Sequence, residues 1–302
     1  MSIWVCGEVL IDLIPGADGA RVPHVGGGPA NTAKALARLG LDSFFIDGIS
    51  TDEYGVAARK ELLDDGVKLD LALTSDKPTC LATVTLDANG GASYEFLIDE
   101  TATFDFSLDW LPDPSRYKPN VLHIGTLVTV IEPGADVLYD WAIRVAEFAP
   151  IVYDPNIRPS VMGDRDRYQA SVEKWAAISS VIKVSDDDMA WLYPGVEFAD
   201  VAKRWVSDGA ALVVVTRGSQ GLIGFTADGV VEVPGVKIEV ADTVGAGDTV
   251  GAIIVEAMVE KGILNLTGEE LKSTLHRAAV AAGITCSRKG AQPPYKHELK
   301  GV

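Results

Sequence analysis

The chain has 302 residues, of which 47% are hydrophobic, so it is long enough to bury the core of one large α/β domain. Its formal net charge of −17 argues against the basic surface with which proteins bind nucleic acid or anionic membranes. No apolar run approaches the length of a membrane span and no basic leader opens the chain, so we expect a cytoplasmic protein.

Short runs of β-forming residues alternate with helical patterns along the chain. This alternation is typical of a mostly parallel sheet with helices on both faces, so we predict a three-layer α/β/α fold. The predicted strands are residues 3–6, 43–47, 121–124, 151–154, 181–184, 212–216 and 222–226. The predicted helices are residues 29–39, 52–64, 133–148, 164–178, 199–207 and 269–287, together with one that begins near Gly247.

Two segments interrupt this alternation, and each reads as a β-hairpin. The first joins residues 9–14 to 20–25, and the second joins residues 81–86 to 93–98 across a glycine-rich turn at 87–91. We expect them to form a small sheet, a lid made of about residues 9–25 and 79–100, that covers a site or pairs with another subunit through its strand edges. The alternative is decoration at the edge of the main sheet.

No linker, low-complexity tract or repeat divides the sequence, so we predict a single domain over residues 1–302. The cysteines Cys6, Cys80 and Cys286 are odd in number, widely spaced and without a metal-ligand pattern. We therefore expect buried thiols, no disulfide and a reducing compartment.

A first glycine cluster, Gly26-Gly27-Gly28-Pro29-Ala30-Asn31, opens the first predicted helix. A dinucleotide-binding loop would follow the first strand directly, where the chain instead reads Gly7-Glu8-Val9, and the Gly-Lys-Ser/Thr ending of a Walker loop is absent. The cluster does suit close approach to a small polyol, with Asn31 as donor and acceptor and Asp12 accepting from hydroxyls. On spacing alone, Asn31 is equally well a polar residue of a helix turn, and Asp12 an acid at a strand end.

A second cluster, Asp242-Thr243-Val244-Gly245-Ala246-Gly247-Asp248-Thr249, places a carboxylate at the start of a helix with apolar residues at helical spacing. The N–H groups of a first helical turn attract anions, and such small residues leave room for phosphate oxygens. A carboxylate is unsuitable as a phosphate ligand, but Asp248 suits a base that takes a proton from an attacking hydroxyl. The alternative is a tight turn with a first-turn acid.

Together the two clusters resemble the signatures of the ribokinase-like (PfkB) carbohydrate kinases. Gly27 to Asn31 matches the N-terminal signature of the family, and Asp242 to Thr249 matches the C-terminal one. Their order, their wide separation and the lid hairpins agree with the family over nearly the whole chain. Within it, residues 7–12, 26–40 and 154–159 are most similar to bacterial fructokinases.

The resemblance implies a set of site residues. Asp248 would be the catalytic base, and the amides of Gly245, Ala246 and Gly247 would stabilise charge on the transferred phosphoryl group. The implied sugar-binding residues are Asp12, Gly27, Gly28, Asn31, Phe96 and Arg158. The implied nucleotide-binding residues are Lys183, Ser185, Thr216, Gly218, Gly221, Ala279 and Gly283. Asp188 would hold Mg²⁺ through water, and Asp242 is the candidate ligand of a monovalent cation such as K⁺.

Three of these residues, and Arg217 next to Thr216 in the loop similar to the nucleotide-phosphate loop of the family, have structural alternatives. Ala279 and Gly283 also suit close helix packing. Arg217 either adds charge beside the nucleotide phosphates or is solvated, and Arg158 either faces the site or pairs on the surface with acids near Asp164 and Asp166.

The chain departs from the family pattern in two places. Ser185 and Asp188 stand where many members have Asn and Glu, which shortens the reach but keeps a hydroxyl and a carboxylate for a hydrated metal. Phe96-Leu97-Ile98 stands where some relatives carry Phe-Tyr-Arg. Loss of that arginine removes a partner for a sugar carboxylate and favours a neutral sugar.

The resemblance therefore predicts a kinase that depends on ATP and Mg²⁺ and transfers the γ-phosphoryl group to a primary hydroxyl, with fructose at its 6-hydroxyl as the first choice. Ribose, a nucleoside or 2-keto-3-deoxygluconate are alternative substrates. A catalytically silent sugar-binding regulator is a further alternative, against which the intact Asp248 argues. The expected partners are the sugar, ATP and a second copy of the chain, joined through the lid strands into a homodimer.

Overall fold

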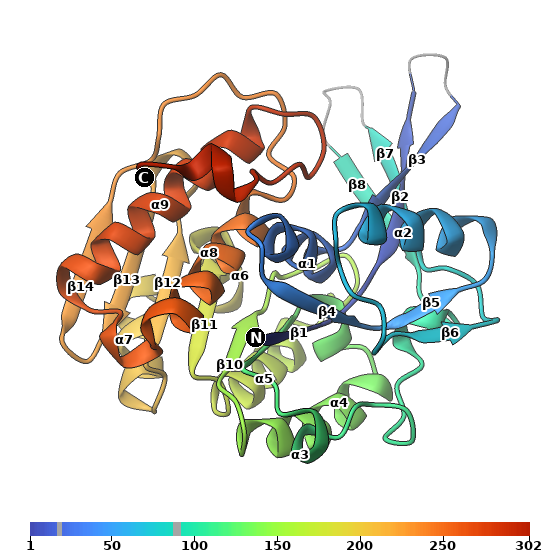
Figure 1. Ribbon diagram of the computed structural model, residues 1–302, viewed down its shortest axis with the longest axis horizontal. Helices are drawn as coiled ribbons and strands as arrows, with labels where there is room; N and C mark the ends of the chain where they lie inside the picture. Colours follow the sequence, from blue (N-terminus) through green and yellow to red (C-terminus); the bar gives the residue numbers. More distant parts are fainter. Residues whose placement is uncertain (17–19, 87–91) are drawn as a thin grey trace.

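The computed structural model describes residues 1–16, 20–86 and 92–302, and a long twisted sheet runs through this part of the chain (Figure 1). Its strands are β1 (Ser2–Cys6), β4 (Asp42–Ile46), β9 (Val121–Gly125), β10 (Ile151–Asp154), β11 (Val181–Ser185), β12 (Leu212–Thr216), β13 (Leu222–Thr226) and β14 (Gly229–Val233). In the described residues the order of this eight-stranded sheet is β14-β13-β12-β11-β10-β9-β1-β4. The strands from β4 to β12 are parallel, whereas β13 is antiparallel to both of its neighbours.

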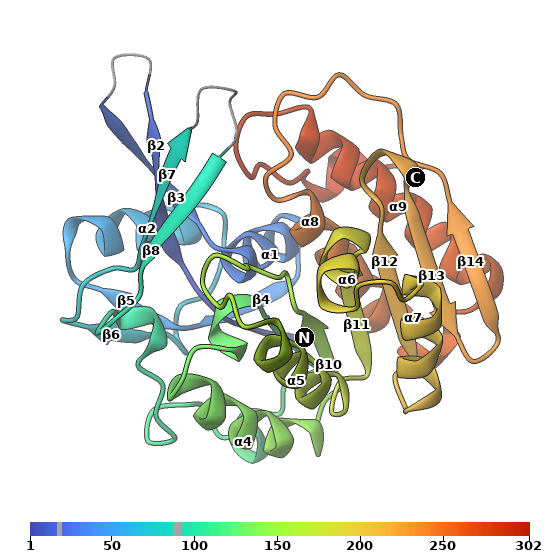
Figure 2. The ribbon, with the colours of Figure 1, turned by 180° about the vertical axis from the view of Figure 1, so that it is seen from behind.

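Helices cover both faces of this sheet, as Figure 2 shows from behind. One layer consists of α1 (Gly28–Arg38), α2 (Glu53–Asp64), α8 (Ala246–Lys261) and α9 (Gly268–Cys286). The other contains α4 (Gly134–Ala146), α5 (Arg165–Ala176), α6 (Asp186–Leu192) and α7 (Phe198–Ser207), with the short α3 (Pro114–Tyr117) beside α4. Each layer buries its own apolar core against the sheet, around Ile254 and Leu275 on the first face and around Trp141 and Trp175 on the second.

The parallel strands are mostly apolar because both of their faces are covered, with His123 of β9 and Lys183 of β11 as buried polar exceptions. Residues Leu212 to Val215 of β12, for example, are all fully buried. Polar side chains therefore appear mainly at the carboxyl ends of these strands, where the sheet meets the loops.

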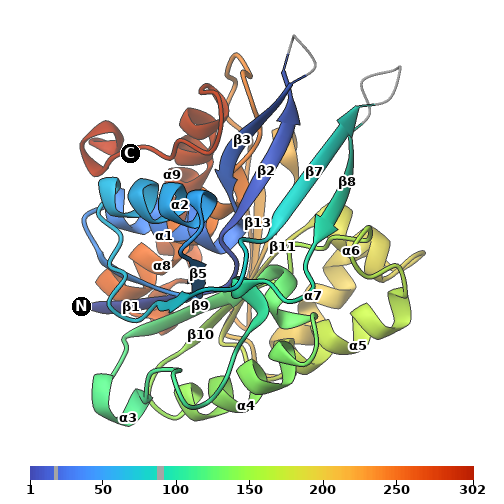
Figure 3. The ribbon, with the colours of Figure 1, turned by 90° about the vertical axis from the view of Figure 1, so that its right-hand side faces the viewer.

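A second, smaller sheet projects from one side of the main sheet, as the edge-on view in Figure 3 shows. It consists of β2 (Leu10–Pro15), β3 (Arg21–Gly26), β7 (Leu81–Leu86) and β8 (Ala92–Leu97), and its order in the described residues is β3-β2-β7-β8. Both expected hairpins are present, as the antiparallel pairs β2–β3 and β7–β8. The predicted turn residues 17–19 and 87–91 lie outside the described residues.

The predicted fold class is confirmed, and each predicted strand and helix is found with ends that differ by no more than two residues. Of the α-helices and strands in the described part of the chain, five were missed, among them the four-residue helix α3. The strands β5 (Gly48–Ser50) and β6 (Leu73–Ser75) are too short for an alternating pattern, β14 follows β13 after a tight turn, and α6 begins in an acidic run without helical periodicity.

The three cysteines have the expected free thiols, although Cys286 is only partly buried. None of the helices within the described ranges combines the length and the apolar character that crossing a membrane requires.

The packing of α4 predicts how a core truncation affects stability. Leu138 is fully buried in the core between α4 and the sheet, whereas Ile143 on the same helix is 42% exposed. Leu138→Ala should lower the free energy of unfolding by about 2–5 kcal/mol, because it removes buried methyl groups and leaves a cavity. Ile143→Ala should change it by less than about 0.5 kcal/mol. Urea unfolding of both variants checks this, and equal effects would contradict the assigned burial.

Candidate functional site

The two glycine clusters, far apart in the sequence, meet where α1 and α8 begin. Asn31, in the first turn of α1, donates a hydrogen bond from Nδ2 to Oδ2 of Asp248 in the first turn of α8, at 2.9 Å. Thr32 also contacts the Asp248 carbonyl, at 3.5 Å. The contact shows that both signatures build one site.

Two glycines are needed at this junction because other atoms occupy the space of a side chain. A Cβ on Gly28 would lie 2.9 Å from Nδ2 of Asn156 and 3.2 Å from Oδ1 of Asp248. Gly27 has φ of 106°, and a Cβ there would lie 2.3 Å from the Glu8 carbonyl oxygen. The first cluster thus brings bare backbone against the candidate base.

The carboxylate of Asp248 is buried, with 9% of the residue exposed. Burial raises its pKa to about 6; the positive charge of Lys183 opposes this shift and the charge of Asp154 adds to it. Asp248 is therefore mostly ionised at neutral pH, but its pKa lies closer to neutral pH than the pKa of an exposed aspartate does. This suits a group that must accept a proton and release it again.

A fixed positive charge lies beside the turn that precedes α8. Lys183, in the middle of β11, is buried and donates from Nζ to Oδ2 of Asp154 at 2.7 Å. A Cβ on Gly247 would lie 2.9 Å from the same Nζ, so the ammonium group reaches the backbone of this turn. Burial lowers the pKa of Lys183, but the carboxylates around it, Asp154 first, outweigh burial and raise the pKa above its usual value. Lys183 therefore stays charged.

The turn before α8 is tight and is held by contacts with the segment after α9. Gly245 precedes the helix with φ of 80°, a left-handed conformation, and a Cβ there would lie 2.7 Å from Cβ of Ala291. The Ala246 amide already donates a long hydrogen bond, 3.3 Å, to the Thr243 carbonyl. Asp242 accepts from the amide of Val244 at 3.1 Å and from that of Gly290 at 2.9 Å.

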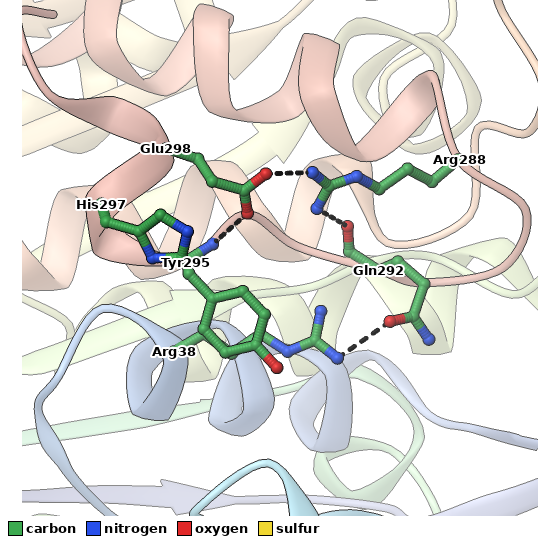
Figure 4. Close-up of a pocket in the computed structure, with 6 residues that line it drawn as sticks. All are labelled: Arg38, Arg288, Gln292, Tyr295, His297 and Glu298. Atoms are coloured by element: carbon green, nitrogen blue, oxygen red, sulfur yellow. Dashed lines mark hydrogen bonds and ion pairs between the residues drawn. The ribbon is translucent and has the colours of Figure 1, made fainter.

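The segment after α9 contacts both this turn and the end of α1. Figure 4 shows its contact with Arg38 of α1. Arg38, at the end of α1, donates to Oε1 of Gln292 and to the Pro293 carbonyl, both at 2.8 Å. Arg288 pairs with Glu298 in the same cluster. Because Gly290 and Ala291 contact the turn before α8, this segment connects the end of α1 to that turn.

The small sheet contributes Asp12 from β2. Asp12 lies opposite His24 of β3 and next to Ala82 of β7, which in turn lies opposite Phe96 of β8. Burial raises the pKa of Asp12 to about 6, an effect that the charges of Arg158 and His24 oppose. The four strands thus present a carboxylate, a small residue and an aromatic ring in one row across the sheet.

Arg158, in the loop after β10, is half-buried and turned toward the site. Its Nη1 donates to Oδ1 of Asn156 at 2.9 Å, and its charge acts on both Asp12 and Asp248. Asp164 instead caps α5 by accepting from the Arg167 amide. The alternative of a surface ion pair for Arg158 is thus not what the structure shows.

A cavity of about 820 Å³ lies on the other side of the turn, between α8, α9 and the loop that follows β14. Its walls are largely apolar, with Val236 and Ile238 facing Gly283 of α9. It reaches Ala246 and Gly247 and so opens next to Asp248. The sequence-predicted residues that line it are Thr216, Gly218, Gly221, Ala279 and Gly283, together with Ala246 and Gly247.

Ser185 and Asp188 do not line this cavity; they form the capping box of α6. The Ser185 hydroxyl accepts from the Asp188 amide at 3.0 Å, and Oδ1 of Asp188 accepts from the Ile157 amide at 3.1 Å. Burial raises the pKa of Asp188. Arg217 is neither solvated nor aimed at the cavity, since its side chain is 13% exposed and pairs with Glu232.

Sequence reasoning missed four residues of the site. Asp154 and Asn156 stood in a run that resembled fructokinases but received no role. Glu8 also stood in such a run without receiving a role, and Thr126 gave no signal. Their contact joins residues 118 positions apart.

Comparisons with known proteins agree with this geometry. The model of the pfkB family carbohydrate kinases matches residues 2–298. A fructokinase of Rhizobium leguminosarum bv. trifolii is 35% identical over 87% of this chain and 81% of its own length. Fructokinase-2 of Oryza sativa subsp. japonica is 32% identical over 95% and 88%.

Among solved structures, the fructokinase of Xylella fastidiosa with bound ATP is 25% identical and superposes with a TM-score of 0.88 over 98% of this chain and 97% of that one. The two signatures, the site that they build and these matches lead to one conclusion. The chain belongs to the pfkB family and is an ATP-dependent carbohydrate kinase.

Proposed function

We propose that the chain is a fructokinase in which Asp248 is the general base. The ionised carboxylate takes the proton of the sugar 6-hydroxyl as the hydroxyl oxygen attacks the γ-phosphorus of ATP. The bond from that phosphorus to the bridging oxygen breaks, and ADP leaves with the electron pair. The observation that carries the proposal is the Asn31–Asp248 hydrogen bond, which fixes a buried carboxylate at the N-terminus of α8.

The cavity beside α8 and α9 is the proposed ATP site. Its size suits a nucleotide, and its apolar part between Val236, Ile238 and Gly283 suits the flat base. Thr216, Gly218 and Gly221 would contact the phosphates. The amides of Gly245, Ala246 and Gly247, together with Lys183, would stabilise charge on the transferred group.

The site fits a magnesium ion that arrives with ATP. The described residues contain no cluster of three or more ligands for a dedicated metal site, and both oxygens of Asp188 already accept amide hydrogens. Mg²⁺ on a nucleotide takes most of its ligands from phosphates and water, so one carboxylate that contacts it through water is sufficient. Bound there, the ion would neutralise phosphate charge, and Asp188 and Ser185 would hold its water.

A monovalent cation such as K⁺ is proposed at Asp242. Each of its oxygens accepts one amide hydrogen and keeps a further lone pair for a cation. A cation there would stabilise the turn that holds Gly245.

Fructose would lie between the small sheet and the start of α1. Asp12, Gly27, Gly28, Asn31, Phe96 and Arg158 are the proposed contacts. The relatives named fructokinase support fructose, and the absence of an arginine after Phe96 favours a neutral sugar over a sugar acid.

The small sheet is the proposed lid, since its closure would exclude water and favour transfer over hydrolysis. Its edge strands β3 and β8 would pair with a second copy in a homodimer. The free cysteines support a cytoplasmic location.

The substrate is tested by measuring ADP release from Mg·ATP with fructose, ribose, glucose, adenosine and 2-keto-3-deoxygluconate. We expect selective turnover of fructose. Preference for another sugar would overturn the assignment of fructose as the substrate but would leave the kinase activity in place. Binding without turnover would favour a regulator.

Asp248→Asn should abolish turnover, because the amide cannot accept the proton, while sugar and nucleotide still bind. In the unmodified enzyme kcat/KM should rise with pH through about 6, since the base must be ionised and its pKa is raised to about 6. Steady-state kinetics and calorimetry check both points. Substantial activity in the variant, or a profile flat between pH 5 and 7, would rule out this base.

Gly283→Leu should raise the KM for ATP by about tenfold and leave the KM for fructose unchanged, because the new side chain enters the cavity toward Ile238. Thr274→Val is the control, because Thr274 is buried on the same helix. An unchanged KM for ATP in Gly283→Leu would show that the adenine ring of ATP does not lie beside Gly283.

A further inference from the structure

The wall of the site beside Gly28 contains two residues in left-handed backbone conformations. Thr126 has φ of 60° and Asn156 has φ of 40°. Both approach the same point, since a Cβ on Gly28 would lie 3.1 Å from Cγ2 of Thr126 and 2.9 Å from Nδ2 of Asn156. Oδ1 of Asp248 would lie 3.2 Å from it. The side chains of Thr126 and Asn156 therefore lie against Gly28, at the point that the Asp248 carboxylate also approaches.

The two residues differ in how well they tolerate this conformation. Asparagine is enriched in the left-handed region, whereas a β-branched residue such as threonine is a genuine outlier there. A residue of this kind persists only when its surroundings hold it in place, and such residues cluster at functional sites. Thr126 thus needs a stronger restraint than Asn156.

Each residue is held by a charged side chain. Nη1 of Arg158 donates to Oδ1 of Asn156 at 2.9 Å and to its carbonyl at 3.2 Å. The hydroxyl of Thr126 donates to Oε1 of Glu8. Glu8 also contacts the site through its backbone, because its carbonyl oxygen lies where a side chain on Gly27 would be. Glu8 therefore connects the Gly27–Gly28 turn to the strained residue after β9.

The proposed chemistry gives Glu8 no task, although it is 3% exposed. Within the described residues its Oε2 has no hydrogen-bond partner. Burial raises its pKa to about 7, so both protonation states are populated at neutral pH. A carboxyl group keeps an acceptor oxygen in either state, so the bond from Thr126 persists in both.

We propose that Glu8 is a positioning residue of the kinase: its carboxyl group holds Thr126 in the left-handed conformation and so fixes the wall against which Gly28 and Asp248 pack. Without this bond Thr126 relaxes toward negative φ, and its methyl group and peptide move relative to the carboxylate. A displacement of about 1 Å at a reacting group reduces rates by about 10²-fold. The inference rests on the proposed kinase activity.

Substitutions at position 126 separate the backbone conformation from the side chain. Thr126→Val keeps the β-branched shape but cannot donate to Glu8, so its kcat should fall by about 10²-fold. Thr126→Gly also loses the hydroxyl, but glycine adopts positive φ without strain, so its kcat should stay near that of the unmodified enzyme. The KM for ATP should not change in either variant, because the nucleotide cavity does not include this wall.

Substitutions of Glu8 test the same restraint on Thr126 from the acceptor side of the hydrogen bond. Glu8→Ala should lower kcat as Thr126→Val does, and Glu8→Gln should retain activity because its amide oxygen still accepts from the hydroxyl. The double variant with Glu8→Ala and Thr126→Gly should have a kcat at least about tenfold higher than that of Glu8→Ala alone, since glycine needs no restraint. Glu256→Ala is the matched control: Glu256 is also 3% exposed, but it pairs with Arg277 far from the site. It should lower the thermal midpoint without lowering kcat.

Three results would overturn the inference: equal kcat values for Thr126→Val and Thr126→Gly, no rescue of Glu8→Ala by Thr126→Gly, or an inactive Glu8→Gln. If Glu8→Ala does not fold, the comparison at position 126 decides alone. If the unmodified protein phosphorylates no sugar in the panel, the proposed function fails instead. Thermal unfolding then decides the inference, because Thr126→Gly should unfold at a higher temperature than Thr126→Val.

Discussion

The hydrogen bond from Asn31 to Asp248 is the contact on which the rest of the site depends. It places the first turns of α1 and α8 side by side at the carboxyl ends of the central strands, where parallel sheets position ligands. Glycines at 27 and 28 permit the close approach, since any side chain there would overlap Glu8, Asn156 or Asp248. The need for small residues at the start of α1 follows from this contact, whereas Gly245 and Gly247 at the start of α8 are needed because Ala291 and Lys183 lie close to them.

An acidic chain that binds a polyanion must concentrate positive charge locally. In this chain, with a formal net charge of −17, the N-terminus of α8 and Lys183, which Asp154 holds beside Gly247, are the groups proposed to do so. The ion pair is buried, so salt screens it less than it would screen a surface lysine. In the proposed function, binding of the nucleotide phosphates would thus depend on a few oriented groups and not on the overall charge of the surface.

The sequence predicts those parts of the molecule that depend on local patterns. Apolar periodicity located the main strands and helices, and the two glycine clusters located Asn31 and Asp248. Helix α6 was missed because Asp186 to Asp188 carry no apolar periodicity, although Ser185 and Asp188 form a capping box that is readable afterwards. The same capping explains why these two residues lie in a helix start and outside the nucleotide cavity. The contact between Glu8 and Thr126 has no local signature, because it depends on a left-handed backbone and on the pairing of β1 with β9.

Gly27, Gly245 and Thr126 share a positive φ but differ in how they tolerate it. At Gly27 and Gly245 the positive φ is free of strain, and the absent side chain is needed because neighbouring atoms fill its space. At Thr126 glycine would also relieve the backbone, and it would need no side chain to hold it there. A β-branched residue adopts this conformation only when its surroundings restrain it, and here the buried carboxyl group of Glu8 supplies the hydrogen bond. Among the described residues with positive φ, Thr126 is the one β-branched residue, and its methyl group lies beside Gly28, close to the point that Asp248 also approaches.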